Sequence, residues 1–154
     1  MMGATATMQH WQTFARLHDA QPDDIPALTA LACRLPAAAN GEWPVWATLI
    51  QAADANVLVA TECHLVVGAA LIWHHKGAQL ARLAWLGVTA DARGRGVGQL
   101  LLETSIARAA VTGATSVGTR LPAAADALHA LLNEAGFAAA KGGEMHLSLV
   151  RSPR

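Results

Sequence analysis

Residues 86–99 read LGVTADARGRGVGQ, and this stretch decides how the rest of the sequence is interpreted. It begins at the end of an apolar run, Gln79–Val88, that is typical of a strand, and it leads into residues with helical periodicity. Between the two lie Gly94, Gly96 and Gly98, at alternate positions. Glycine tolerates a positive φ and lets a ligand approach the backbone closely. The stretch therefore predicts a strand, a tight loop and a helix in direct succession.

The predicted loop has the chemistry of an anion site. Helix N-termini carry unpaired N–H groups and the positive end of the helix dipole, and both favour a bound anion. Arg93 and Arg95 add positive charge beside the glycines. A phosphate cradle is the functional interpretation of this pattern. The alternative is a glycine-rich turn with solvated arginines, because glycine clusters are common in turns.

Two well-known phosphate-binding motifs do not fit these residues. A P-loop needs a lysine directly after its last glycine, and the only lysines, Lys76 and Lys141, lie elsewhere. The dinucleotide fingerprint needs the spacing G-x-G-x-x-G and an acidic residue about twenty positions later. Here the spacing is G-x-G-x-G, and the next acidic residues are Glu103 and Asp126. These two motifs therefore do not identify the ligand, and a longer stretch of the sequence has to be considered.

Periodicity on either side of the loop predicts the remaining elements. The β-rich runs Val57–Thr61, Leu65–Trp73 and Gln79–Val88 have short links, the first of them only residues 62–64, which favours an antiparallel meander. The other expected elements are a weak strand at Trp11–His18, helices at Pro22–Leu35 and Trp43–Ala53, a helix at Gly98–Thr112, a strand at Ser116–Leu121, a helix at Ala123–Ala135 and a strand at Met145–Val150. This order predicts a mixed α/β fold whose first half is largely antiparallel.

Composition limits the class of protein. Of the 154 residues, 53% are apolar, but 35 are alanine, and the remaining strongly apolar residues, roughly 30%, are typical of one globular domain. We expect a disordered tail at residues 1–10 and a single domain over residues 11–151. Eleven basic and eleven acidic residues give no net charge, so the basic surface of a nucleic-acid-binding protein is missing.

Three further features concern the membrane, the cysteines and metals. The longest apolar run, Val66–Trp73, is too short to cross a bilayer, and residues 1–9 do not resemble a signal peptide. Two cysteines are too few for a disulfide scaffold of this size. The Cys-His pair at residues 63–64 and the His-His pair at residues 74–75 are separated by about 30 Å of strand, so no metal site is expected. The sequence predicts a soluble, cytoplasmic protein.

Two segments resemble the GNAT superfamily of N-acetyltransferases. Residues 93–98, RGRGVG, match its R/Q-x-x-G-x-G/A loop, which follows a strand and precedes an apolar helix. Residues 130–137, ALLNEAGF, resemble its second signature, a helix that closes in Gly-Phe before a terminal strand. The resemblance covers about residues 12–150. It implies a mixed, largely antiparallel sheet flanked by helices, in agreement with the order of elements above.

The resemblance also implies an acyl-coenzyme A donor, usually acetyl-CoA. Its pyrophosphate would be held by backbone amides of the loop, with Gly96 and Gly98 giving access to the backbone. Its pantetheine arm would pair with the preceding strand. A main-chain amide near Val88 would polarise the thioester carbonyl, and an amine would attack it directly. The implied donor-binding residues are Leu86, Gly87, Val88, Arg93, Gly94, Arg95, Gly96, Val97, Gly98 and Gln99.

The sequence departs from the family at the usual acid and base. Many members carry a glutamate base where Arg82 stands here and a tyrosine acid where Leu132 stands, and this chain contains no tyrosine. His129, on the last predicted helix, and His74, at a strand end, are the substitute proton carriers that the sequence offers. The alternative explanation of each is an ordinary surface or half-buried histidine.

Three tryptophans are candidates for an acceptor site. Trp43 and Trp46 follow the first predicted helix, a segment that lines the acceptor pocket in the family, and Trp85 lies just before the loop. The resemblance therefore implies an aromatic wall that receives the acceptor. Because Trp43 and Trp46 share one face of a helix, a core contact or a dimer contact is the alternative.

These features together predict an enzyme that transfers an acetyl group from acetyl-CoA to an amine of a small molecule or peptide. The missing acid and base leave a second interpretation open, a non-catalytic acyl-CoA-binding regulatory module. A third interpretation is a scaffold or dimerisation protein whose glycine loop is only a turn. The sequence does not reveal the acceptor, the acyl-chain length or whether the chain forms a homodimer.

Overall fold

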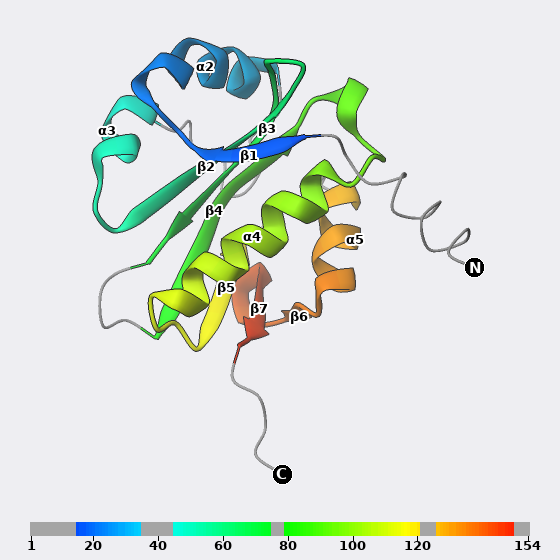
Figure 1. The fold of residues 1–154 in the computed structure, drawn as a ribbon. Helices are drawn as coiled ribbons and strands as arrows, with labels where there is room; N and C mark the ends of the chain where they lie inside the picture. Colours follow the sequence, from blue (N-terminus) through cyan, green and yellow to red (C-terminus); the bar gives the residue numbers. More distant parts are fainter. Residues whose placement is uncertain (1–14, 35–44, 75–78, 121–125, 150–154) are drawn as a thin grey trace, which may run out of the picture.

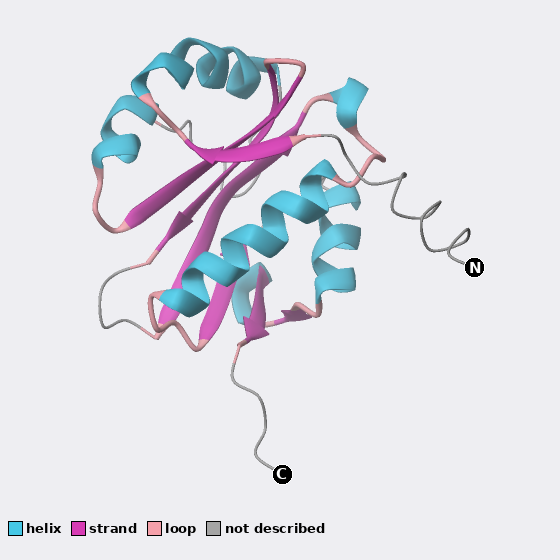
Figure 2. Cartoon of the chain, in the orientation of Figure 1, coloured by secondary structure: helices cyan, strands magenta, loops and turns pink. Residues whose placement is uncertain are grey.

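The computed structural model describes residues 15–34, 45–74, 79–120 and 126–149. Within these ranges, seven strands form one sheet in the order β1-β2-β3-β4-β5-β7-β6. Helices α2 and α3 lie on one face of the sheet, and α4 and α5 lie on the other (Figure 1, Figure 2). This mixed sheet flanked by helices confirms the predicted fold class. The expected tail at residues 1–10 lies outside the described residues, and the domain bounds 11–151 stay a prediction.

The described elements follow the predicted order, and the largest shift is in the first strand, which begins at Arg16 and not at Trp11. The described strands are β1 (Arg16–Asp19), β2 (Ala55–Glu62), β3 (Leu65–Trp73), β4 (Leu80–Val88), β5 (Ser116–Arg120), β6 (Ala138–Ala139) and β7 (Glu144–Ser148). The described helices are α2 (Ile25–Arg34), α3 (Trp46–Gln51), α4 (Val97–Val111) and α5 (Asp126–Ala135), with short 3-10 turns η1 (Pro22–Asp24), η2 (Ala90–Ala92) and η3 (Lys141–Gly143). The sequence did not predict β6, because two residues are too few to show a periodicity.

Strands β2, β3 and β4 form the predicted antiparallel meander. Two details differ from the prediction, one in the first turn of the meander and one in the helix before it. The first turn is tighter than expected, because β2 runs through Glu62 and only Cys63 and His64 connect it to β3. Both turn residues have a positive φ, 51° and 68°, as the central residues of a type I′ hairpin turn require. The helix before the meander is shorter than expected, because the extended backbone of Ala52 ends α3 at Gln51.

A β-bulge in β4 decides which core each of its side chains enters. The register passes from Leu71 opposite Trp85 to Ile72 opposite Leu83, so Ala84 is an extra residue on β4. As a result, Leu83 packs into the core beneath α4 and α5, whereas Trp85 packs into the second core beneath α2 and α3. Strict alternation would place both side chains on the same face.

Strands β4 and β5 begin side by side and then separate. Their parallel pairing covers only Leu80–Arg82 against Ser116–Gly118. One residue further, the Thr119 hydroxyl donates to the Leu83 carbonyl at 2.8 Å. Beyond Leu83, β4 keeps β3 on one edge, and none of the described strands pairs with its other edge. We call this opening the β4–β5 fork.

We expect Thr119→Val to lower the free energy of unfolding by about 1–3 kcal/mol, because the Leu83 carbonyl would lose its hydrogen bond in a buried site. Valine keeps the shape of threonine, so the packing changes little. Thr115→Val is the matched control, because the Thr115 hydroxyl contacts the Gln79 carbonyl at 3.3 Å in an exposed position. Urea unfolding of both variants measures the difference. Equal losses would contradict a special role for Thr119 at the fork.

Candidate functional site

The glycine loop joins the end of β4 to the start of α4, at the end of the sheet toward which the β4–β5 fork opens. After η2 the chain turns through residues 93–96, and Gly96 is the N-cap of α4. Gly94 and Gly96 have φ values of 81° and 86°, in the left-handed region that glycine enters at little cost. The predicted succession of a strand, a tight loop and a helix is confirmed.

The first turn of α4 presents backbone donors that the helix does not use. The first intrahelical hydrogen bond runs from the Leu100 N–H to the Gly96 carbonyl at 3.0 Å. The N–H groups of Val97, Gly98 and Gln99 therefore precede the helical ladder, and no described side chain at the N-cap bonds to them. Such donors at the positive end of a helix dipole can hold an anion.

Both arginines of the loop contact neighbouring parts of the fold. The Arg93 Nε donates to the Val88 carbonyl at 3.2 Å, and the Arg95 guanidinium lies 2.6 Å from a carboxylate oxygen of Glu62 at the end of β2. Both contacts are exposed to solvent, where an ion pair contributes no more than about 1 kcal/mol. The arginines thus have a part in shaping the loop that the sequence did not reveal.

Gly98 has a packing role that the sequence also did not reveal. It lies in the first turn of α4 and its φ is not positive. A Cβ at this position would lie 3.2 Å from Leu131 Cδ2 and 3.6 Å from Val88 Cγ2. The missing side chain therefore lets α4 approach α5 and β4 closely. Ligand access to the backbone, the reason expected from the sequence, stays a prediction for Gly96 and Gly98.

The structure brings together two of the three tryptophans of the expected acceptor wall. Trp46 and Trp85 pack edge to face, with ring centroids 5.5 Å apart. Both are 3% exposed in the core beneath α2 and α3. For Trp46, this is the core alternative that the sequence left open. The buried indole N–H of Trp46 has no hydrogen-bond partner in the described part of the chain. Trp43 lies outside the described residues, and contact of these rings with an acceptor stays a prediction.

The candidate histidine His74 lies away from the glycine loop. Its imidazole hydrogen-bonds the Asn56 side chain of β2, and its backbone N–H donates to the Asp54 carbonyl at 2.7 Å. Along β3 it is six residues from Gly68, which pairs with Val88 beside the loop, and this corresponds to about 20 Å of strand.

The other candidate, His129, lies on α5 together with Leu132. His129 is half-buried, and Leu132 is fully buried in the core beneath α4 and α5. An aliphatic side chain thus occupies the position that the resemblance aligns with the family's tyrosine. The catalytic roles of His129 and His74 stay predictions.

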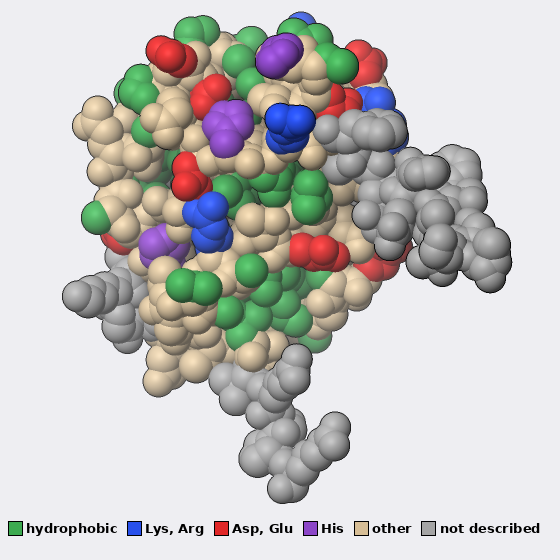
Figure 3. All heavy atoms as spheres, in the orientation of Figure 1, with side chains coloured by type: hydrophobic (Ala, Val, Ile, Leu, Met, Phe, Trp, Pro, Cys, Tyr) green, Lys and Arg blue, Asp and Glu red, His purple; other side chains and the backbone are tan. Residues whose placement is uncertain are grey.

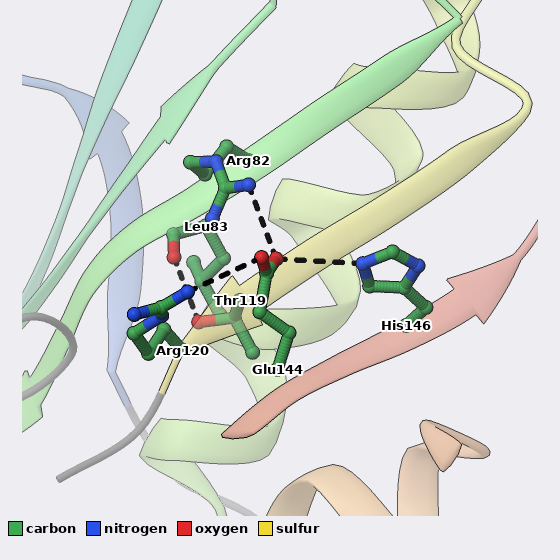
Figure 4. Close-up of polar contacts among 6 residues, drawn as sticks. All are labelled: Arg82, Leu83, Thr119, Arg120, Glu144 and His146. Carbon is green, nitrogen blue, oxygen red and sulfur yellow. Dashed lines mark hydrogen bonds and ion pairs between the residues drawn. The ribbon is translucent and has the colours of Figure 1, made fainter. Parts of the chain in front are cut away.

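Three charged side chains and one histidine at the fork form a group that the sequence did not predict. Arg82 of β4, Arg120 of β5 and His146 of β7 surround the carboxylate of Glu144, also on β7 (Figure 4). The Arg82 Nη2 donates to Glu144 at 3.1 Å, and the Arg120 Nη2 and the His146 Nε2 lie 3.5 Å and 3.4 Å from the carboxylate oxygens. The hydrogen bond and the charge of Arg82, followed by the contacts with His146 and Arg120, lower the pKa of Glu144 from its ordinary value of 4.5. We call these four residues the fork cluster.

The sequence signal for this cluster is weak. Glu144 and His146 alternate with the buried Met145, as polar residues on the open face of a strand do. The strand predicted from the sequence begins at Met145 and does not include Glu144. Only the position of Arg82 was singled out, and its partners follow it by many residues in the chain.

The lowered pKa of Glu144 predicts how stability depends on pH. Since the folded pKa lies below the unfolded value, the charge of Glu144 adds stability above about pH 5, and this stability is lost as the pH falls through the folded pKa. We expect Glu144→Gln to be less stable than the parent at about pH 7, and the difference to shrink below about pH 4. Urea unfolding across this range measures it. A difference that does not change with pH would contradict the charge pairing.

A surface pocket of about 360 Å³ lies between α4 and α5. Its lining includes the apolar side chains of Leu102, Ile106 and Leu131 and the carboxylates of Glu103 and Glu134. On the face drawn in Figure 3, apolar side chains gather where these helices lie, with acidic side chains beside them. The two carboxylates disfavour a phosphate group in this pocket, in contrast to the backbone donors of the glycine loop.

The described part of the chain holds neither a metal-binding cluster nor a membrane-spanning helix. No three His, Cys, Asp or Glu side chains in it are grouped so that they could hold a metal ion. None of its helices combines the length and the apolar character that crossing a bilayer requires. The absence of a metal and the cytoplasmic location expected from the sequence stay predictions.

The sequence of this chain matches the sequence model of a protein family, in agreement with the order of elements and the glycine loop. The sequence model of the acetyltransferase (GNAT) domain matches residues 53–139, which include β2 to β6. This match covers more than half of the chain, and the protein belongs to the GNAT family of acetyltransferases, an acetyl-CoA-binding family. No curated protein has a matching sequence.

Solved structures with the same fold include three that align over most of their length. The ribosomal-protein-S18-alanine N-acetyltransferase of Escherichia coli aligns with a TM-score of 0.74 and 20% identity, over 91% of this chain and 97% of that chain. An N-acetyltransferase from Staphylococcus aureus Mu50 aligns with a TM-score of 0.74 and 19% identity, over 90% and 100% of the two chains. A Salmonella typhimurium protein, solved with its cofactor acetyl-CoA, has a TM-score of 0.70 and 19% identity, over 92% and 98%. At these identities the likeness establishes a GNAT-like fold.

Proposed function

We propose that this protein is an N-acetyltransferase that transfers the acetyl group of acetyl-CoA to an amine of a small molecule or peptide. The observation that carries the proposal is that the uncapped start of α4 lies beside the open edge of β4. A ligand with a pyrophosphate at one end and an extended arm at the other matches both features.

The glycine loop is the proposed site for the pyrophosphate of the donor. Its backbone donors lie between Arg93 and Gln99, and the positive φ values of Gly94 and Gly96 turn the chain there without a Cβ. Hydrogen bonds from backbone N–H groups to a charged phosphate contribute roughly 1.5–3 kcal/mol each. Two or three such bonds are sufficient to anchor the nucleotide end of the donor.

The open edge of β4 is the proposed site for the pantetheine arm, which would bind as an added strand. On the β3 side, the Thr89 N–H donates to the Val67 carbonyl at 2.8 Å. The N–H and C=O groups of successive residues alternate between the two edges of an antiparallel strand. The backbone groups of Leu86 and Val88 therefore point toward the fork, whereas those of Gly87 point toward β3. An N–H group on this edge would polarise the thioester carbonyl as charge develops on its oxygen.

The proposed reaction is a direct transfer. The lone pair of the neutral amine attacks the thioester carbonyl carbon, an N–C bond forms and the C–S bond breaks. The thiolate takes up a proton equivalent to the one that the amine nitrogen releases, so the products are an N-acetyl amine and the free thiol of CoA. The protein accelerates this step by holding both reactants in the attack geometry.

The proton balance predicts how the rate depends on pH. Arg82 and Leu132 stand at the family's usual base and acid positions, and the carboxylate beside Arg82, that of Glu144, has a lowered pKa and is a weak base. The acceptor ammonium therefore loses its proton to water, and thiol release should rise steadily from about pH 7 to about pH 9. A bell-shaped profile with a group near about pH 6 to 7 that disappears in His129→Ala would contradict this and identify His129 as the base.

Two measurements test the proposed function. Calorimetric titration with acetyl-CoA should show saturable binding, and thiol release should depend on an added amine from a panel. Binding without thiol release would instead support a non-catalytic acyl-CoA-binding regulatory module, which Arg82 and Leu132 at the base and acid positions favour. If no CoA ester binds, the glycine loop is only a turn and the protein is better interpreted as a scaffold.

A further inference from the structure

The fork cluster lies on the face of the sheet opposite α4 and α5. The residues next to its members along the strands are buried beneath α4 and α5, and successive side chains of a strand point to opposite faces. These buried neighbours are Ala81, Leu83, Thr119 and Met145, and Leu147 is partly buried. On the face of the cluster, α2 and α3 pack against β3 and β2. The Arg82, Arg120 and His146 side chains are 42%, 55% and 45% exposed, so the cluster faces solvent beside these helices.

The cluster also lies at the closed end of the fork. Arg82 pairs with Gly118 in the last rung of the β4–β5 ladder, and the bond between Thr119 and Leu83 follows directly. This inference rests on the proposed function, in which the pyrophosphate lies at the glycine loop and the arm lies along the open edge of β4, in the direction of Leu83. The acyl group at the end of the arm therefore points toward the cluster.

The fork cluster carries an excess of positive charge. Two guanidinium groups surround one carboxylate, which leaves a net charge of +1 when His146 is neutral. Each guanidinium has five N–H donors, and Glu144 contacts one nitrogen of Arg82 and one of Arg120. The remaining donors on these exposed side chains can therefore pair with a second anion.

We propose that the acceptor amine also carries a carboxylate, as an amino acid does, and that Arg82 and Arg120 bind this carboxylate. The planar set of donors on arginine matches the two oxygens of a carboxylate and makes the pair geometrically specific. Glu144 is then a positioning residue, because it contacts both guanidinium groups. The substrate carboxylate would contact the two arginines and not Glu144. An amine without an acidic group leaves the excess charge unpaired and binds more weakly.

The test compares product analogues that differ in a single group. N-acetyl derivatives of glycine, methionine and lysine, each as the free carboxylate and as the primary amide, are titrated calorimetrically into the protein with saturating CoA. We expect at least one carboxylate to bind about 10-fold or more tightly than its amide, as a charge-assisted hydrogen bond predicts. Arg120→Gln should reduce this preference to less than about 3-fold, and Arg120→Lys should restore part of it, because lysine keeps the charge without the bidentate geometry.

Arg108→Gln is the matched control for these variants. Arg108 lies on α4, is 38% exposed and pairs with Asp19 at 2.8 Å, so its loss removes an exposed arginine and one ion pair away from the cluster. It should leave the CoA affinity and the carboxylate preference unchanged. If CoA binds but amides bind as tightly as carboxylates, or neither binds, the acceptor assignment is wrong and the donor site stands. If CoA itself does not bind, the proposed function and this inference both fail.

Discussion

Gly96→Asp is expected to weaken the binding of acetyl-CoA by about 10- to 1,000-fold, which corresponds to the loss of one or two charge-assisted hydrogen bonds. Gly96 is the N-cap of α4, next to the N–H groups that the helix does not use. A side chain at this position would occupy the space of the bound pyrophosphate, and an aspartate adds repulsion between like charges. Calorimetric titration with acetyl-CoA measures the loss of affinity.

This variant needs a control for backbone strain. Gly96 has a φ of 86°. An aspartate in this left-handed region lowers the free energy of unfolding by about 1–2 kcal/mol, whether or not its side chain blocks the ligand. Gly113→Asp is matched, because Gly113 follows the other end of α4 with a φ of 97°, and a Cβ there would meet no atom within 4 Å. Both variants should lose thermal stability, and only Gly96→Asp should lose affinity. If Gly96→Asp binds acetyl-CoA as the parent does, the acetyltransferase proposal loses its main support.

Gly68→Ala is expected to lower the free energy of unfolding by about 1–3 kcal/mol through overpacking. The φ of Gly68 is not positive, so the reason is steric. A Cβ there would lie 3.0 Å from the Gly87 carbonyl oxygen, 3.0 Å from Leu101 Cδ1 and 3.2 Å from Val97 Cγ1. The carbonyl belongs to the backbone of β4, and the Leu101 and Val97 side chains are fully buried. None of these groups can move without displacing its own neighbours.

Gly118→Ala is the control for this substitution. Gly118 is also a strand glycine whose φ is not positive, and a Cβ there would lie 3.1 Å from the His146 imidazole. The His146 side chain is 45% exposed and can rotate away, so we expect a loss of less than about 0.5 kcal/mol. Urea unfolding gives both values. Equal losses would show that the close approach of β3 to α4 does not constrain residue 68.

Much of the fold around the glycine loop could be predicted from local patterns. The strand at Leu65–Trp73 has the predicted bounds, and α4 begins at Val97, one residue before its predicted start. Alternation of apolar residues, helical spacing and the placement of glycines act between residues that are close in the chain, so the sequence displays them directly. The family resemblance, which the match over residues 53–139 confirms, depends on the same kind of contiguous motif.

The features that the sequence did not predict involve contacts between elements. Alternation does not account for Trp85, because the bulge at Ala84 moves its ring to the core of Trp46. The spacing of Gly98 indicated a ligand, whereas the structure also places Leu131 of α5 against it. A bulge and a helix contact depend on the neighbour across the sheet or the layer, and the local sequence does not identify that neighbour.

The sequence by itself determined the antiparallel meander and the strand, loop and helix around Gly96, because each arises from the conformational preferences of consecutive residues. Only the tertiary structure decided that β5 lies between β4 and β7, and this order brings Arg82 and Glu144, 62 residues apart in the chain, to within 3.1 Å. The charge of the fork cluster therefore depends on which strands become neighbours. That choice is made by long-range pairing and by burial of the two cores, and no single segment of the sequence contains it.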